Sequence, residues 1–142
     1  MGEQTTVSQS NEPPIARAAF RVDDEELVSR VERLSNEELD ALPFGVVRLD
    51  ATGKISFFSR TEATQSGFGE RKAVGRKFFT ELAPCMGTPD FMRHVERAQA
   101  AGTLDITFEQ IGDFDDAERE LHVRVTSAAG GGLWVFIQRG AV

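Results

Sequence analysis

The 142-residue chain contains a single cysteine, Cys85, in the stretch ELAPCMGTPDF. One cysteine forms no disulfide within its own chain, so the thiol either packs as a small apolar side chain or reacts with a group from outside. A partner histidine brought close by the fold stays open, but no local signature indicates a Cys–His nucleophile, and we expect no enzyme and no catalytic residue. Any chemistry at Cys85 therefore needs an external partner.

Three further side chains have a spacing that could place them together. Phe58, Glu62 and Ser66 follow one another at steps of four. Side chains at this spacing share one face of a helix, so a helical turn here would aim all three inward. A carboxyl group and a hydroxyl would then share an apolar pocket. Most glutamates lie in solvent, and from spacing alone that remains the stronger interpretation of Glu62.

The residues that commonly bind metal ions do not form a convincing cluster. His94 and His122 are the only histidines, and no second ligand type stands three or four residues after either of them in a convincing cluster. The stretch GDFDDAERE brings Asp113, Asp115 and Asp116 together, but it lacks the glycine and the closing glutamate of a calcium loop. The sequence therefore predicts a solvated hairpin turn here and no metal site.

Composition limits the class of protein. A hydrophobic fraction of 40% with 27% charged residues is ordinary for a soluble domain, and the longest apolar runs are too short to span a bilayer. The N-terminus shows no secretory signal, so we expect a cytoplasmic protein with no membrane partner. A net charge of −7, with the sixteen Lys and Arg scattered among acids, argues against a nucleic-acid partner.

The chain divides into a tail and one domain. Residues 1–20 are polar and interrupted by prolines, which predicts a disordered tail before a domain over residues 21–142. Two short helices should follow the tail, the second opened by a capping box between Ser35 and Glu38 and ended by Pro43. These two helices are the predicted N-terminal helical cap.

Five β-rich runs and one clear helix make up the rest of the domain. Strands are predicted at residues 44–50, 54–59, 104–111, 118–128 and 133–139, and the helix begins at Thr88 and ends near Gly102. Two strands, helices and three strands build a five-stranded antiparallel sheet with helices on one face, an α+β fold. A pocket should form between the sheet and the helices, with Cys85 on its wall.

Several stretches carry a resemblance to a known family. LDALPFGVVRLDATGKI, VGRKFFTELAPC, TPDF and LWVFIQR occur in this order between about Glu26 and Arg139. In these stretches the chain resembles the photoactive yellow protein family, blue-light receptors with the PAS fold. The resemblance implies that Cys85 carries p-coumaric acid as a thioester. It also implies that Glu62 hydrogen-bonds the chromophore's phenolate and gives it a proton after photoisomerisation, and that Ser66 stands for the family's threonine.

The chain also departs from the family's pattern. Phe58 occupies the place of the tyrosine that donates a second hydrogen bond to the phenolate, and the chain has no tyrosine at all. Phe68 replaces an arginine that covers the pocket, while Met86 and Phe114 are expected on the pocket wall. A lost hydrogen bond to a buried anion forfeits about 1.5–3 kcal/mol, a rise of roughly one to two units in the phenol's pKa. The chromophore is then expected to be partly protonated near neutral pH.

Two interpretations of function follow from this resemblance. In the first, the protein is a blue-light photoreceptor with p-coumaric acid as its covalent cofactor; in the second, it is a chromophore-free PAS sensory or protein-interaction domain. We favour the first, because Cys85 and Glu62 have no shared purpose in the second. The expected partner is an unidentified downstream signalling protein, and the expected state is a monomer or weak dimer.

Overall fold

The computed structural model describes residues 20–69, 71–113 and 116–139, and of Cys85 only the backbone. The predicted tail, apart from Phe20, lies outside these ranges, and so does Phe114. The statements that follow concern the described residues.

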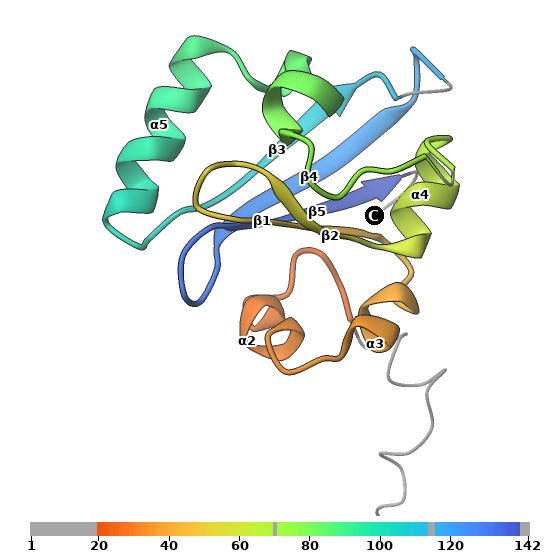
Figure 1. Ribbon diagram of the computed structural model, residues 1–142, viewed down its shortest axis with the longest axis horizontal. Coiled ribbons are helices and arrows are strands. Elements are labelled where there is room, and N and C mark those ends of the chain that lie inside the picture. Colours follow the sequence, from red (N-terminus) through yellow and green to blue (C-terminus); the bar gives the residue numbers. More distant parts are fainter. Residues whose placement is uncertain (1–19, 70, 114–115, 140–142) are drawn as a thin grey trace, which may run out of the picture.

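The predicted five-stranded antiparallel sheet is confirmed (Figure 1). Its strands are β1 (Gly45–Leu49), β2 (Ile55–Phe58), β3 (Asp105–Ile111), β4 (Glu120–Ser127) and β5 (Leu133–Arg139). They lie in the order β2-β1-β5-β4-β3, so the first and last strands of the chain pair at the centre of the sheet. Every strand coincides with one of the β-rich runs of the sequence.

Helices cover both faces of this sheet (Figure 1). On one face lie α2 (Leu27–Val31) and α3 (Asn36–Asp40), which form the N-terminal helical cap; on the other lie α5 (Pro89–Ala100), a π-helical turn (Phe78–Leu82) and a 3₁₀ turn (Pro84–Met86). The remaining helix, α4 (Arg60–Ser66), directly follows β2. The architecture is therefore α+β, as predicted.

The helix boundaries follow from side-chain caps. Ser35 opens α3 with the predicted capping box, in which the backbone N–H of Glu38 donates to Ser35 Oγ over 3.2 Å and the N–H of Ser35 donates to Glu38 Oε1 over 2.9 Å. At α5, Thr88 Oγ1 accepts from the N–H of Phe91 over 3.3 Å, and a proline follows the cap. These caps satisfy backbone donors that have no partner within the helix.

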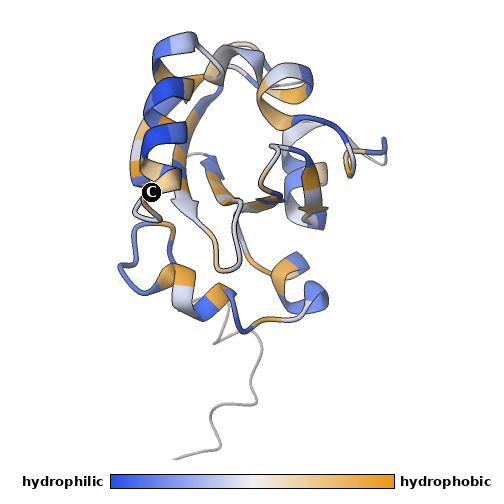
Figure 2. Cartoon of the chain, turned by 60° about the vertical axis from the view of Figure 1, so that its left-hand side comes forward, coloured by the Kyte–Doolittle hydropathy of each residue, from blue (hydrophilic) through white to orange (hydrophobic). Residues whose placement is uncertain are grey.

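The sheet separates two hydrophobic cores. Along β5, Trp134 and Phe136 pack against the N-terminal helical cap, whereas Val135 and Ile137 belong to the core on the opposite face. This alternation is the two-residue period of a strand with both faces covered. Figure 2 shows hydrophobic segments of the cap and of the helices turned toward the sheet. β5 is thus a wall shared by both cores.

Two side chains of β4 attach the segment before α2 to the sheet through polar contacts. Arg124 on β4, only 5% exposed, donates to the carbonyl oxygens of Val22 and Asp24 over 2.8 and 2.6 Å. His122, also on β4, lies between Asp23 and Glu109, with its Nε2 2.8 Å from Asp23 Oδ1 and its Nδ1 2.7 Å from Glu109 Oε2. The hydrogen bond with Glu109, followed by that with Asp23, raises the pKa of His122 above its ordinary value.

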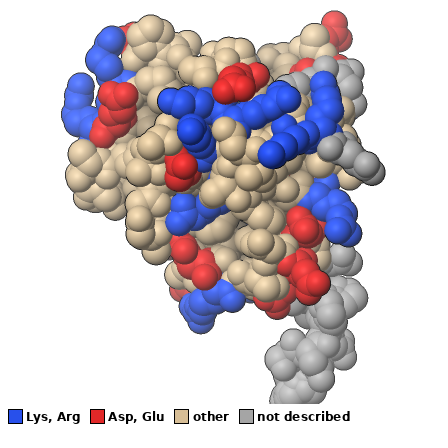
Figure 3. Space-filling view, viewed as in Figure 1, with Lys and Arg blue, Asp and Glu red and all other residues tan. Residues whose placement is uncertain are grey.

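The charged side chains are less evenly spread than the sequence predicts. Figure 3 shows Lys and Arg side chains gathered in a band across one face of the molecule, with Asp and Glu prominent below the band. Among the described residues, the segment after α4 contributes four exposed basic side chains, namely Arg71, Lys72, Arg76 and Lys77. No helix in the described part of the chain is long and apolar enough to cross a membrane.

Candidate functional site: a pocket with a buried charge cluster

A pocket of about 370 Å³ lies between the sheet and the turns that precede α5. Most of its wall is apolar, and its charged groups come from α4, from the loop after β3 and from the end of β5. This volume lies within the range of small-molecule sites, which are typically apolar with a few polar groups. The lining residues are Phe58, Glu62, Phe78, Leu82, Ala83, Met86, Ile111, Gly112, Asp113, Ala117, Leu121, Ile137 and Arg139.

Local structure places Glu62 at the polar end of this pocket. Ser59 caps α4, accepting at Oγ from the N–H of Glu62 over 3.1 Å and from the N–H of Val46 in β1 over 3.0 Å. The Ser59 side chain thereby ties the first turn of α4 to β1. Glu62, in this turn, is only 2% exposed. Gly45 makes room for the carboxyl group, because a methyl group at this position would overlap Glu62 Oε1.

Arg139, at the end of β5, holds the Glu62 carboxyl group with two parallel hydrogen bonds. Its Nη1 lies 2.8 Å from Glu62 Oε1 and its Nη2 lies 2.9 Å from Glu62 Oε2. The same guanidinium reaches Asp113, with Nε 2.5 Å from Oδ2 and Nη2 3.3 Å from Oδ1. The side chains of Arg139 and of both acids are between 3% and 8% exposed. Such two-point contacts are the strongest geometry of an arginine–carboxylate pair.

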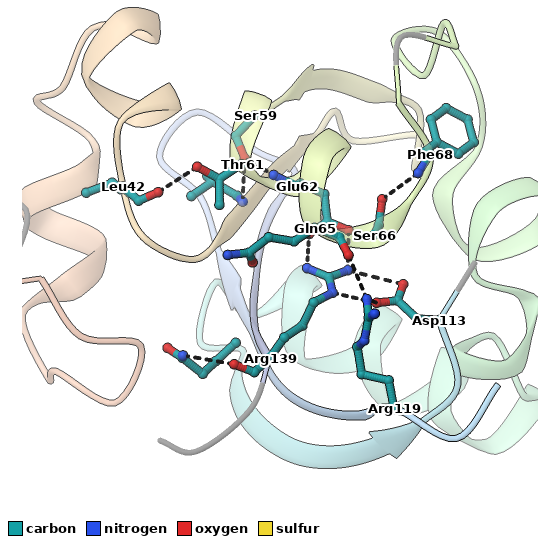
Figure 4. Close-up of polar contacts among 12 residues, drawn as sticks. Leu42, Ser59, Thr61, Glu62, Gln65, Ser66, Phe68, Asp113, Arg119 and Arg139 are labelled. Atoms are coloured by element: carbon teal, nitrogen blue, oxygen red, sulfur yellow. Dashed lines mark hydrogen bonds and ion pairs between the residues drawn. The ribbon is translucent and has the colours of Figure 1, made fainter. Parts of the chain in front are cut away.

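A second arginine completes the cluster. Arg119 donates from Nη1 to Asp113 Oδ2 over 3.1 Å and to the backbone carbonyl of Gln65 over 2.7 Å. Figure 4 shows Arg119 and Arg139 converging on Asp113. With both acids ionised, the two guanidinium groups and the two buried carboxylates have no net charge; Arg119, 30% exposed, also lies 3.8 Å from the exposed Asp116 carboxylate, measured from Nε to Oδ2.

The protonation of the cluster depends on two opposing effects. The pKa of Glu62 is raised above its ordinary value: burial is the largest cause and the negative charge of Asp113 adds to it, while the hydrogen bonds and the positive charge of Arg139 offset only part of the rise. Burial lowers the pKa of Arg139, but its hydrogen bonds with Glu62 and Asp113 outweigh burial and leave this pKa above its ordinary value. Arg139 therefore stays charged, and its charge is available to stabilise an ionised Glu62.

The structure places the three residues with four-residue spacing in different environments. Phe58 is the last residue of β2 and not part of a helix, so the predicted common helical face is wrong for this residue, although its side chain does line the pocket. Glu62 and Ser66 are both buried on α4. Ser66 is not among the described lining residues, and its Oγ accepts from the N–H of Phe68 over 3.0 Å.

Phe68 is not among the described residues that line the pocket, and its ring packs on that of Phe58, which does line it. Its ring is 4% exposed and lies 5.5 Å from the ring of Phe58, centroid to centroid. The guanidinium groups of Arg71 and Arg76 lie 4.4 and 5.8 Å from the centroid of the Phe68 ring. Two arginines therefore lie against the Phe68 ring at distances typical of cation–π contacts.

The turn that contains Cys85 lies beside the pocket. Ala83 and Met86, on either side of it in the chain, both line the pocket, and the backbone of Cys85 lies in the intervening 3₁₀ turn. Met86 is therefore placed where the sequence predicts it. The side chains of Cys85 and Phe114 are outside the described part of the structure.

Sequence reasoning missed Arg119, Asp113 and Arg139. The prediction of a solvated turn is wrong for Asp113, whose side chain is 3% exposed and ion-paired, but correct for the exposed Asp116. One signal for Arg139 was present in the sequence: it follows Ile137 by two residues and so belongs on the same face of β5.

Three or more potential metal ligands do not gather anywhere among the described residues.

The fold and the pocket together define a class of protein. A ligand-sized pocket lies between one face of a single antiparallel sheet and the turns that precede α5, and residues 34–139 match the family model of the PAS fold. The chain therefore belongs to the PAS-fold family.

Within this family, photoactive yellow proteins are the chain's relatives. The protein of Rhodothalassium salexigens is 29% identical over 107 residues, which cover 75% of this chain and 86% of the relative. That of Halochromatium salexigens is 26% identical over 116 residues, or 81% of this chain and 93% of the relative. A crystal structure of the photoactive yellow protein domain from the sensor histidine kinase Ppr of Rhodospirillum centenum is 31% identical, with a TM-score of 0.63, and the match covers 77% of this chain and 96% of that one.

Proposed function

We propose that this protein is a blue-light photoreceptor whose chromophore is p-coumaric acid, bound as a thioester to Cys85. The observation that carries this proposal is the position of Cys85 between Ala83 and Met86, two residues that line a pocket with Glu62 in its wall. The likeness to photoactive yellow proteins supports the same assignment. The coarser conclusion, a sensory domain of the photoreceptor type, rests on the PAS fold together with the likeness to photoactive yellow proteins.

The residues of the pocket suit an aromatic acyl group. Apolar side chains from the sheet and from the turns, including Phe78, Leu82 and Ile137, would bury a flat ring. Glu62 and Arg139 supply polar partners for an oxygen atom at the end of the ring. A bound p-coumaroyl group would supply absorption of blue light and a double bond that isomerises, chemistry that the side chains of the protein cannot provide.

The described residues have distinct roles in this proposal. The apolar wall excludes water, which strengthens the interactions of Glu62 within the pocket. Glu62 exchanges a proton with the terminal oxygen of the ligand, and Arg139 fixes the position of its carboxyl group. Phe58, which lines the pocket, would offer a bound ligand an apolar surface and no hydrogen bond.

The signal is proposed to leave through the N-terminal helical cap. Its helices pack on the opposite side of β5 from the pocket, and α2 and α3 are only five residues each. Short helices held by few contacts open more easily than the sheet. A downstream signalling protein would bind the sheet face that the cap releases; the relative that belongs to a sensor histidine kinase supports a partner of this kind.

Reconstitution of the purified protein with activated p-coumaric acid tests the proposal. We expect the intact mass to rise by one chromophore and a visible or near-ultraviolet band to appear, with neither change in Cys85→Ala. A matched control, Cys85→Ala/Ser29→Cys, moves the only thiol to an exposed position on α2. Equal labelling and equal spectra for the wild type and this control would refute a specific site at Cys85.

One observation favours the chromophore-free alternative. Arg139 already satisfies both oxygens of Glu62, so the pocket needs no ligand to compensate its buried acid. A PAS domain that binds only a partner protein predicts no pocket-dependent colour after reconstitution. The experiment above therefore discriminates between the two functions.

A further inference from the structure

We propose that the exposed basic side chains beside the start of β2 form a docking surface for an acidic segment of another protein. This surface, the basic patch, consists of Lys54, Arg71, Lys72, Arg76 and Lys77, all of which are exposed. The inference goes beyond the proposed function, because it concerns a surface outside the pocket and requires no chromophore.

Backbone pairing and one aromatic ring bring the basic patch together. Lys77 stands directly opposite Lys54 in an isolated antiparallel bridge. The first residue of β2, an edge strand of the sheet, donates its N–H to the carbonyl oxygen of Arg76 over 2.8 Å. The guanidinium groups of Arg71 and Arg76 lie 4.4 and 5.8 Å from the centroid of the Phe68 ring. The patch is therefore one continuous surface fixed to the edge of the sheet.

The positive charge of the basic patch is not balanced by ion pairs. Residues 71–77, RKAVGRK, contain four basic residues and no acid, in a chain with a net charge of −7. No ion pair joins the five side chains of the patch to an acid in the described part of the chain. Two neighbouring acids bind backbone instead: Asp50 Oδ1 accepts from the N–H of Lys54 over 3.0 Å. Glu81 Oε2 accepts from the N–H of Lys77 over 3.1 Å. Like charges that stand directly opposite each other, as these two lysines do, are unfavourable in a sheet, and an external anion would relieve this cost.

The basic patch also has an apolar centre and a preordered arginine. Val74, between the two pairs of basic residues, is one of two large apolar side chains that are exposed among the described residues. Arg71 donates from Nε to the carbonyl oxygen of Phe68 over 2.7 Å and from Nη2 to that of Gly67 over 3.2 Å. A side chain ordered before binding loses less entropy on binding, and a guanidinium group matches the geometry of a carboxylate. An apolar centre with arginine and a polar rim is typical of protein interfaces.

The surroundings of the basic patch favour a protein partner over a nucleic acid or a membrane. Figure 3 shows Asp and Glu side chains prominent below the band of basic side chains. A DNA duplex or an anionic membrane extends beyond the patch, so its phosphates would also face these acids and be repelled. A short acidic segment places its carboxylates on the patch alone, and an apolar side chain within that segment can contact Val74.

Binding of an acidic peptide to the purified protein tests the inference. The probe is a synthetic peptide of Asp and Glu with interspersed Leu, labelled with a neutral fluorophore and followed by fluorescence anisotropy. We expect saturable binding that weakens as salt is added, and no binding of a matched peptide with Asn and Gln in place of the acids. In Lys72→Glu/Lys77→Glu the Kd should rise at least about tenfold, because two attractions become repulsions. Both side chains are exposed, so this variant should unfold in urea like the wild type.

A matched variant separates the basic patch from the net charge of the protein. Arg93→Glu/Arg97→Glu makes the same change of charge at exposed positions on α5 and should change the Kd by less than about twofold. Val74→Ser should raise the Kd about threefold, because an apolar contact is lost. Equal weakening in the two charge variants, or no binding by the wild type, would overturn the inference. Tighter binding of duplex DNA or of phosphatidylserine vesicles than of the peptide would also overturn it, since the partner would then carry phosphate.

Discussion

Replacing Arg139 by Met should strongly destabilise the folded protein. Arg139 makes four hydrogen bonds to two carboxylates that are each 3% exposed, and Met keeps an apolar stem of similar length without the charge. Removing one partner of a buried ion pair costs about 3–5 kcal/mol. Asp113 keeps Arg119, so we expect a loss near the lower limit, about 3 kcal/mol in the free energy of unfolding.

The loss should depend on pH in a direction that identifies Glu62 as its cause. Burial already raises the pKa of Glu62, and without Arg139 this pKa should rise further. An acid whose pKa is higher in the folded than in the unfolded state binds its proton more tightly when folded, so lowering the pH favours folding. The deficit of Arg139→Met should therefore shrink from about pH 8 to about pH 5, by up to about 1.4 kcal/mol per pH unit while Glu62 titrates.

Urea unfolding of four proteins at both pH values is the assay. The four are the wild type, Arg139→Met, Glu62→Leu and the double variant. The double variant should regain much of the stability, because an apolar pair in place of a buried ion pair is often neutral or stabilising. A loss under about 1 kcal/mol for Arg139→Met, or a deficit that does not change with pH, would refute the reasoning about a buried, mutually dependent pair.

Three further predictions concern other described residues. Gly45→Ala should displace Glu62 from Arg139 and cost about 1–3 kcal/mol in urea unfolding, because the new methyl group overlaps the carboxyl oxygen. Amide exchange of residues 20–42, corrected for intrinsic rates, should show the N-terminal cap loosening as pH rises through the pKa of His122, and His122→Gln should remove this dependence. Phe58→Tyr should lower the midpoint of chromophore ionisation by roughly one to two pH units, because it restores a donor.

Each of these predictions has a contrasting outcome. Adding Glu62→Ala to Gly45→Ala removes the overlapping group and should restore stability, so an equal loss in the double variant would contradict a local clash. Because the pKa of His122 is raised in the folded state, its contribution is complete at low pH and is lost at high pH; a cap that tightens as pH rises would contradict this sign. An unchanged midpoint in Phe58→Tyr would show that another donor already serves the chromophore.

The fold could be predicted largely from the sequence because its signals are local. Turns separate the β-rich runs, Ser35 and Glu38 form the expected capping box, and Thr88 begins the longest helix. Each of these signals depends on residues within one turn or one strand, and local preferences agree with the final sheet. The first cap helix, predicted to follow the tail, begins only at Leu27 and is five residues long.

The charge cluster could not be predicted in the same way. Glu62 and Arg139 are 77 residues apart in sequence, and Arg139 and Asp113 are 26 apart. Spacing indicates which residues share a face of one element, but not which charged side chains meet when two elements pack. The resemblance pointed to a buried Glu62 and remained silent on Arg139, so the electrostatic partner that controls this acid became visible only in three dimensions.

Because both faces of β5 are packed, one against the N-terminal helical cap and the other against the pocket, evolution can change the length of this strand less easily than its side chains. Trp134 and Phe136 face the cap while Ile137 and Arg139 face the pocket, so inserting or deleting a single residue within the strand would exchange the two sets. After such a change the guanidinium group of Arg139 would lie on the face of the sheet that packs against the N-terminal helical cap. The indole of Trp134 would lie on the face that lines the pocket. Substitutions in β5 can change the lining of the pocket or the packing of the N-terminal helical cap separately, but a change of length damages both at once. Lineages derived from this sequence should therefore diversify this strand by point mutation and place their insertions and deletions in the turns beside it.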